Sequence, residues 1–207
     1  WLIGVTMSGY RANHLLHHNK LNTNEDPDWR RNNNKFHRYP KSKRWMSINA
    51  IGMLVGWAYF YIAYRLNNEF SKYKYNKAID IYRMVFYLSI FILSIKFNFL
   101  HLILLYWIVP GMTYFTFLLA YRGLAEHHGC MEYDHIYNST RHIDAKWYEK
   151  FFCVPHNVEY HLAHHLYPQI PFYNLPKLHK LLLEKPIFKE KAHITNGYFT
   201  GLVAELR

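Results

Sequence analysis

Residues 99–121 form a run of 23 positions without a single Lys, Arg, Asp or Glu. As an α-helix rising 1.5 Å per residue, this run would extend about 34 Å, which is enough to cross the hydrocarbon core of a bilayer. Pro110-Gly111 lies in its middle and would break a soluble helix, but membrane helices tolerate such pairs where neighbours or water satisfy the freed carbonyl. The run therefore predicts a transmembrane helix with a kink near Pro110.

A second apolar segment lies directly before this run. Residues 84–95 are too short to cross a membrane alone, and they become long enough if the helix covers residues 79–97. That helix would include Asp80 and Arg83, which are three positions apart and can pair on one face near the membrane surface. We therefore expect a transmembrane hairpin made of residues 79–97 and 99–121.

Residues 48–64 are a third uncharged segment. They contain Gly52-x-x-x-Gly56, a spacing that hints at close packing between helices. Both flanks of the segment are strongly basic, so we expect it to lie at the membrane interface or to dip in and return rather than to cross.

The net charge of +11 is concentrated beside the apolar segments. Residues 19–45 hold eight basic and three acidic side chains, and residues 65–83 hold five and two. Cytoplasmic loops of membrane proteins are rich in Lys and Arg, whereas a nucleic-acid-binding module would carry its charge on a soluble fold. The distribution favours an integral, multi-pass membrane protein and argues against nucleic acid as a partner.

Two histidine clusters share the spacing His-x-x-His-His, which places all three rings on one face of a helix. With 15 His among 207 residues, chance gives about 0.07 such patterns in the chain, so two copies indicate a metal site. If both build one site, they lie on the same side of the bilayer, which the hairpin permits, and we expect that side to be the cytoplasm. The clusters are His14, His17 and His18, and His161, His164 and His165.

The available ligand types narrow the choice of metal. Cys130 and Cys153 are isolated, which argues against zinc ribbons, thioredoxin-like sites and disulfide scaffolds. Either His127 or His128, directly after the apolar run, could add a ligand. Imidazole suits zinc, copper, iron and nickel, but zinc needs only three or four ligands and no His-Glu-x-x-His motif is present. The surplus of imidazoles indicates two metal ions, and two irons could activate dioxygen against an unactivated alkyl chain.

A membrane metal-binding or transport protein is the alternative from another class. Transporters place ionisable residues at membrane depth along the path of the ion. Here only His101 lies inside a predicted span, and both clusters fall outside, which counts against transport. If the chain were a purely structural membrane protein, its two clusters of identical spacing would have to arise by chance.

Several motifs together resemble the membrane fatty acid desaturase family. They are the first histidine cluster with the following NTNEDPDW (residues 22–29), RGLAEHHG (residues 122–129), and residues 157–179, which run from Asn157 through the second cluster to Leu178-His179. The resemblance implies an all-α membrane protein in which a cytosolic helical cap carries the histidines, within a single domain over residues 1–207. It also implies a di-iron enzyme that uses dioxygen, and electrons from a carrier such as a ferredoxin or a cytochrome, to desaturate or hydroxylate a lipid.

Carried over by motif, the resemblance assigns seven iron ligands. His128 is the alternative to His127 as a ligand, and Asn157 would orient a ligand or a water molecule. We assign the leucines and His179 of an expected helix over residues 175–183 to packing instead. The seven ligands are His14, His17, His18, His127, His161, His164 and His165.

One motif of the family is missing. The family has an earlier His-x-x-x-His motif, or a form longer by one residue, and residues 1–13 contain no histidine. We therefore expect this chain on its own to bind iron incompletely and not to turn over.

The reaction and the substrate stay open at this point. Desaturation and hydroxylation both begin with hydrogen abstraction and differ in whether oxygen is then added to carbon. Carotenoids and sphingolipids are further substrate classes, because the motifs describe the metal site and not the cavity for the lipid tail. Among these we favour desaturation of a fatty acyl lipid.

Overall fold

The computed structural model describes residues 7–28, 39–57, 59–60, 77–129 and 136–207. Helices dominate these residues, and the strands among them are only two residues long. The chain divides into two compact units: unit 1 is Trp1–Leu15 with Ile48–Phe117, and unit 2 is Leu16–Ser47 with Leu118–Arg207. The predicted all-α fold is confirmed, and the single domain over residues 1–207 stays a prediction.

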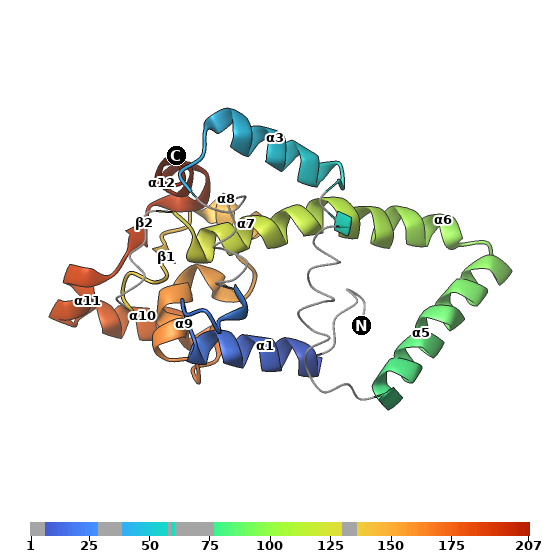
Figure 1. Ribbon diagram of the computed structural model, residues 1–207, viewed down its shortest axis with the longest axis horizontal. Helices are drawn as coiled ribbons and strands as arrows, with labels where there is room; N and C mark the ends of the chain where they lie inside the picture. Colours follow the sequence, from blue (N-terminus) through green and yellow to red (C-terminus); the bar gives the residue numbers. More distant parts are fainter. Residues whose placement is uncertain (1–6, 29–38, 58, 61–76, 130–135) are drawn as a thin grey trace. The chain divides into compact units, whose positions relative to one another are not determined.

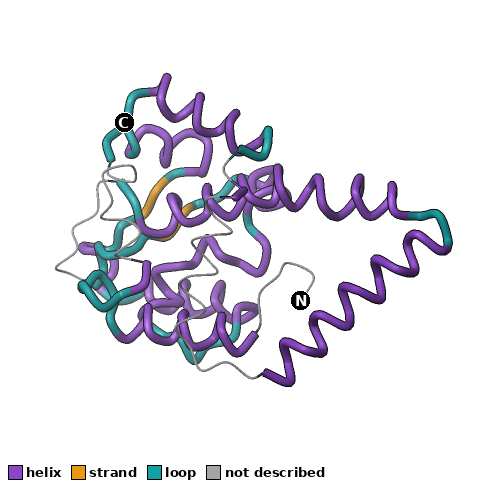
Figure 2. Tube along the Cα trace, turned by 45° about the vertical axis from the view of Figure 1, so that its right-hand side comes forward, coloured by secondary structure: helices purple, strands orange, loops and turns teal. Residues whose placement is uncertain are grey.

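Two long apolar helices follow one another at the centre of the sequence. Helix α5 (Lys77–Lys96) leads through a short turn into α6 (Leu100–Ile103), as Figures 1 and 2 show, and the same helical run continues to the end of α7 (Thr116–His127). Ala78–Lys96 and Leu100–His127 are each long and apolar enough to cross a membrane, and only 6% of either apolar window is buried within the protein. Such exposure is unlike that of a core helix in a soluble protein. These two candidate spans are the helices expected over residues 79–97 and 99–121.

The second of these helices is irregular on both sides of Pro110. Leu104–Ile108 and Gly111–Phe115 are π-helical. Pro110 has no N–H to donate, and wider turns are one way in which a membrane helix adapts to proline. Nearby, the Thr116 hydroxyl donates to the Gly111 carbonyl at 2.8 Å. The disturbance predicted at Pro110-Gly111 thus takes the form of two π-helical segments.

The structure decides two smaller predictions about unit 1. The Arg83 guanidinium lies 2.8 Å from the Asp80 carboxylate, so the predicted ion pair is confirmed. The glycine pair does not share one helix face, because helix α3 (Lys43–Leu54) ends before Gly56, which has a φ of 85°. Gly56 does lie close to the second apolar helix, since a Cβ there would be 3.5 Å from the Met112 carbonyl oxygen. A Cβ on Gly52 would overlap the Trp57 indole, so the lack of a side chain at Gly52 leaves space for Trp57, five residues later. Residue 58 and residues 61–64 of the expected interfacial segment lie outside the described residues.

Unit 2 contains the second half of the sequence. Helix α1 (Met7–Asn19) enters it at Leu16, and α7 enters it at Leu118. The other elements follow in chain order: strand β1 (His142–Ile143), α8 (Trp147–Cys153), a 3₁₀ turn (Pro155–Tyr160), α9 (His161–Leu166), a 3₁₀ turn (Phe172–Asn174), α10 (Leu175–Leu183), α11 (Pro186–Lys191), β2 (Ile194–Thr195), a π-helical turn (Gly197–Leu202) and α12 (Val203–Glu205). Helix α10 has the bounds predicted for it.

Two buried cores hold unit 2 together. One gathers residues from α7, α8 and the C-terminal turns, and it includes Ala125, Cys153, Tyr198 and Leu202. The other joins α9 to α10 and α11 through Leu162, Ala163, Leu182 and Phe188. His179 is buried in α10 with its ring 5.6 Å from that of Phe188, so the packing role predicted for it is confirmed.

A small parallel sheet and an ion-pair network connect the C-terminus to the rest of unit 2. His142 pairs with Ile194 and Ile143 with Thr195 in the β1–β2 register. The Arg141 side chain is fully buried and donates to the Glu205 carboxylate at 2.7 Å. The Thr195 hydroxyl also donates to this carboxylate at 2.7 Å. Helix α12 is therefore held to the strand that leads towards the second histidine cluster.

Candidate metal centre

The second histidine cluster lies on helix α9, directly after a sharp turn. His156 and Asn157 both have positive φ values, 58° and 57°, which kink the chain within the preceding 3₁₀ turn. Asn tolerates this conformation better than most residues. The Asn157 amide also donates to the Phe172 carbonyl at 3.1 Å. This hydrogen bond connects the turn before α9 to the 3₁₀ turn that follows it. The orienting role predicted for Asn157 at the metal site stays a prediction.

Four histidines of unit 2 form a buried group of rings. Nε2 of His161 lies 2.9 Å from Nε2 of His127 and 3.0 Å from Nε2 of His165. The His17 ring lies 4.7 Å from that of His127 and 5.0 Å from that of His165. Helices α1, α7 and α9 therefore each supply an imidazole to one place. One set of possible metal ligands is His17, His127 and His165.

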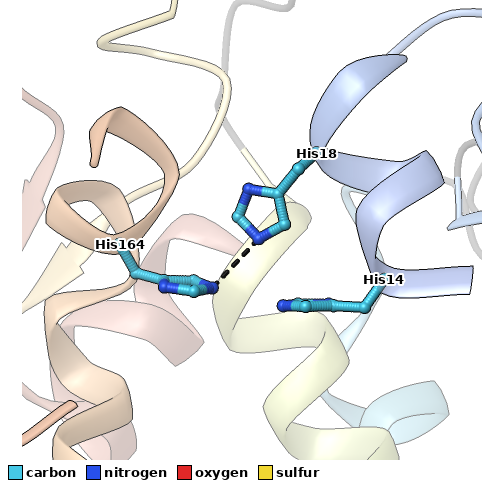
Figure 3. A group of neighbouring side chains, drawn as sticks. All are labelled: His14, His18 and His164. Carbon is cyan, nitrogen blue, oxygen red and sulfur yellow. Dashed lines mark hydrogen bonds between the residues drawn. The ribbon is translucent and has the colours of Figure 1, made fainter. Parts of the chain in front are cut away.

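A second meeting point joins the two histidine clusters. Nε2 of His18 lies 3.0 Å from Nε2 of His164, 146 residues later in the chain (Figure 3). The His18 ring is also stacked on that of His165, with ring centres 4.2 Å apart. His14 lies one turn before His18 on α1 (Figure 3), and its ring is stacked on that of Tyr10.

Burial and crowding favour neutral imidazoles in this group. Removal from water lowers the pKa of His161 and His165 well below the ordinary value, and the neighbouring imidazoles lower it further. A neutral imidazole offers a lone pair, which is the form that binds a metal. Since facing ring nitrogens less than 3.1 Å apart can share at most one proton, the remaining lone pairs suit a cation. The donor set therefore fits the metal centre that the sequence predicts.

Asp26 fixes the orientation of His17. The His17 Nδ1–H donates to Asp26 Oδ1 at 2.9 Å, and the Asp26 side chain is only 1% exposed. Burial alone would raise the pKa of Asp26, but the hydrogen bond and charge interaction with His17, with two backbone N–H groups, hold it below the ordinary value. With the proton on Nδ1, Nε2 of His17 is the nitrogen that can bind a metal. This role of Asp26 was not predicted from the sequence, although Asp26 lies in the NTNEDPDW motif at residues 22–29.

The structure separates the two adjacent histidines at the end of α7. His127 joins the buried group, whereas the His128 Nδ1–H donates to the Gly123 carbonyl at 3.0 Å and its ring lies 5.8 Å from that of Tyr39. The choice of His127 over His128 as a ligand stays a prediction, and the geometry favours it.

Glu126 is a further possible ligand that was not predicted from the sequence. Its carboxylate can be grouped with His127 and His161, and it also accepts hydrogen bonds from the Arg122 guanidinium at 2.7 and 3.1 Å. Its position directly before His127 was the available signal. The group therefore contains one carboxylate beside its imidazoles.

Comparison with known proteins identifies the family. The family model described as Fatty acid desaturase matches residues 1–195. This chain belongs to the fatty acid desaturase family. Dihydrorhizobitoxine desaturase from Bradyrhizobium elkanii is 30% identical over 203 residues, covering 92% of this chain and 57% of that protein. The chain thus spans just over half the length of this desaturase, and no solved structure matches it significantly.

Proposed function

We propose that the protein is a membrane di-iron desaturase that uses dioxygen, and electrons from a carrier, to introduce a double bond into a fatty acyl lipid. One observation carries this proposal: imidazoles from histidine clusters 146 residues apart in sequence meet at 3.0 Å in unit 2. Family membership supports the oxidoreductase class, and the match to a protein named as a desaturase supports the reaction type.

The proposed centre would hold two iron ions through histidine nitrogens. When bound, iron supplies the activation of dioxygen that removal of hydrogen from an unactivated carbon requires, which side chains alone cannot supply. The protein's own residues bind the metal as neutral imidazoles, exclude water by burying their rings, and hold the His17 tautomer through Asp26. The proposed ligands are His17, His18, His127, His161, His164 and His165, together with His14 on α1.

The membrane topology forms part of the proposal. We propose that α5 and the helix from α6 to α7 cross the bilayer, so that both histidine clusters lie on the cytoplasmic side. The low burial of both helices and the basic charge of residues 19–45 support this arrangement. On that side, a reduced ferredoxin or cytochrome could deliver electrons, and a lipid substrate could enter from the bilayer.

The test is the lipid profile of a host that makes the full-length protein, compared with a host that makes the His17→Ala variant. We expect a new double bond in acyl lipids that is lost in the variant, and about two irons per chain in the purified protein. His101→Ala is a matched control, because His101 lies in α6 outside the histidine group, and it should retain the product. A new hydroxyl group would instead assign the protein to the hydroxylases of the superfamily. Zinc in place of iron would support a transport or structural metal site, and absence of any metal would refute the proposed centre.

The substrate is tested separately, because the named relative takes its name from dihydrorhizobitoxine rather than from an acyl lipid. Lipid extracts and water-soluble metabolites of the same hosts should therefore both be compared. A product found only in the water-soluble fraction would agree with the proposed desaturase reaction but would refute the proposal that the substrate is an acyl lipid.

A further inference from the structure

Helix α8 presents large aromatic side chains away from the protein. The Trp147 and Phe151 side chains are four residues apart, on one helix face, and are 82% and 81% exposed. Phe152 beside them is exposed as well. Single exposed apolar residues are common on protein surfaces, but adjoining ones of this size mark a contact surface. We call these three residues the α8 aromatic face.

The opposite face of α8 is fixed inside unit 2. Glu149 is fully buried, and its carboxylate accepts the backbone N–H of Phe199 at 2.9 Å and that of Lys146 at 2.9 Å. Cys153 lies in the buried core shared with α7. Because both buried residues are anchored, α8 cannot turn its aromatic face inward without breaking these contacts.

The buried face of α8 lies at the level where the apolar helix meets its first charges. Tyr121 is the last residue of the uncharged run, and Arg122 and Glu126 form an ion pair directly after it. The Tyr121 hydroxyl donates to the Tyr198 carbonyl at 2.6 Å, and its ring is stacked on that of Phe199, the residue whose N–H binds Glu149. The end of a membrane span, with Tyr followed by charged residues, marks the boundary between hydrocarbon and headgroups. Helix α8 is therefore attached to the span at the depth of this boundary.

The charge on α8 also suits a lipid surface. Its acidic residue, Glu149, is buried, and the preceding Lys146 is exposed. Lys150 is also exposed along its length, with its Nζ 3.3 Å from the buried Glu159 carboxylate. Exposed aromatic rings beside lysines are the side chains that gather at membrane interfaces, where anionic headgroups attract the cations. An acidic protein partner could also bind the lysines. Such a partner would not explain why the helix is attached to the span at the boundary between hydrocarbon and headgroups.

We propose that the α8 aromatic face inserts into the headgroup boundary of the bilayer and holds unit 2 against the membrane at the end of the α7 span. This proposal rests on the membrane crossing by α6 and α7 in the proposed function. The partner is a phospholipid surface that contains anionic lipid.

The test uses tryptophan fluorescence of the full-length protein in vesicles of phosphatidylcholine with a minority of phosphatidylglycerol. The difference between the parent and Trp147→Phe isolates the emission of Trp147, and the difference between the parent and Trp107→Phe isolates that of a residue in the middle of the span. Brominated phosphatidylcholines quench at the depth of the bromines. We expect Trp147 to be quenched more by bromines near the headgroup end of the acyl chain than by bromines near its methyl end, and to be shielded from aqueous acrylamide.

The outcomes separate the two proposals. If Trp107 is quenched by lipid but Trp147 is quenched only by acrylamide, the α8 aromatic face is in water and the inference is wrong. If neither agent quenches Trp147, protein covers the face, and the inference is equally wrong. If lipid fails to quench Trp107, the membrane crossing itself is refuted. As a second variant, Phe151→Ser should raise the access of acrylamide to Trp147, and unchanged access would count against shared insertion.

Discussion

Replacing Asp26 with Asn should weaken metal binding without removing a metal ligand. In the parent, Oδ1 accepts from His17 Nδ1 at 2.9 Å and from the Asp28 N–H at 2.8 Å, while Oδ2 accepts from the Asn22 N–H at 2.9 Å. Asn has one acceptor oxygen, so its NH₂ group must face at least one of these N–H donors. If the amide oxygen stays with His17, the Asn22 N–H loses its acceptor. If the amide turns round, the NH₂ group favours the His17 tautomer with a proton on Nε2, which cannot bind a metal through that nitrogen.

Both orientations have a cost of predictable size. A buried N–H without an acceptor costs about 1–3 kcal/mol of folding free energy. Loss of the carboxylate that orients a histidine ligand typically weakens metal binding by about 10- to 100-fold, which is ~1.4–2.7 kcal/mol. We therefore expect D26N to bind metal at least about tenfold more weakly than the parent, with a lower unfolding midpoint in the metal-free state.

The assay is an anaerobic titration of the purified full-length protein with Fe²⁺ against a competing chelator. Asp28→Asn is the matched control, because its carboxylate lies 3.7 Å from His17 Nδ1 and its side chain is 22% exposed. D28N should bind metal as the parent does. Equal metal affinity of D26N and the parent, with only the folding stability reduced, would show that Asp26 supports the loop and not the metal site.

Three further predictions concern unit 2. His127→Ala should lower the metal content per chain far more than His128→Ala, because only the first ring faces the buried imidazoles; equal losses, measured by elemental analysis, would contradict this. Burial lowers the pKa of His142 from 6.5 to about 3, so the folded protein keeps this ring neutral where the unfolded chain takes up a proton. The contribution of the neutral ring to folding stability is complete above the unfolded pKa of 6.5 and is lost as the pH falls towards 3. About 2 kcal/mol of it is lost by pH 5. His142→Gln should therefore flatten this part of the pH profile of unfolding, and an unchanged profile would refute the assignment. Glu205→Ala leaves the buried Arg141 guanidinium without its carboxylate and should destabilise the protein by about 3–5 kcal/mol; a denaturant midpoint within error of the parent would show that the network carries little stability.

Several features could be predicted from sequence because they depend on neighbouring residues. The span over residues 99–121 follows from the absence of charge, and the Asp80–Arg83 pair follows from helical spacing. Helix α10 could be placed because prolines and hydrophobic periodicity mark its limits. In each case the deciding interaction lies within one or two helical turns.

Other features could not be read in this way. The two glycines at positions 52 and 56 have the spacing of a helix-packing motif, but α3 ends at Leu54, so only Gly56, outside the helix, lies close to another helix. Likewise, His127 and His128 are adjacent and chemically identical, so their roles depend on how α7 is rotated against its neighbours. The role of Asp26 depends on how the chain turns after α1.

The sequence by itself determined that this chain is a helical membrane protein with the histidine motifs of a desaturase, since apolar length, charge placement and motif spacing are all local properties. Only the tertiary structure decided which imidazoles meet, as when His18 lies 3.0 Å from His164 across 146 residues of sequence. The two rings meet because buried contacts hold α1, α7 and α9 in place. These contacts form between segments that are far apart in the sequence, and no local sequence pattern shows that such segments will pack together.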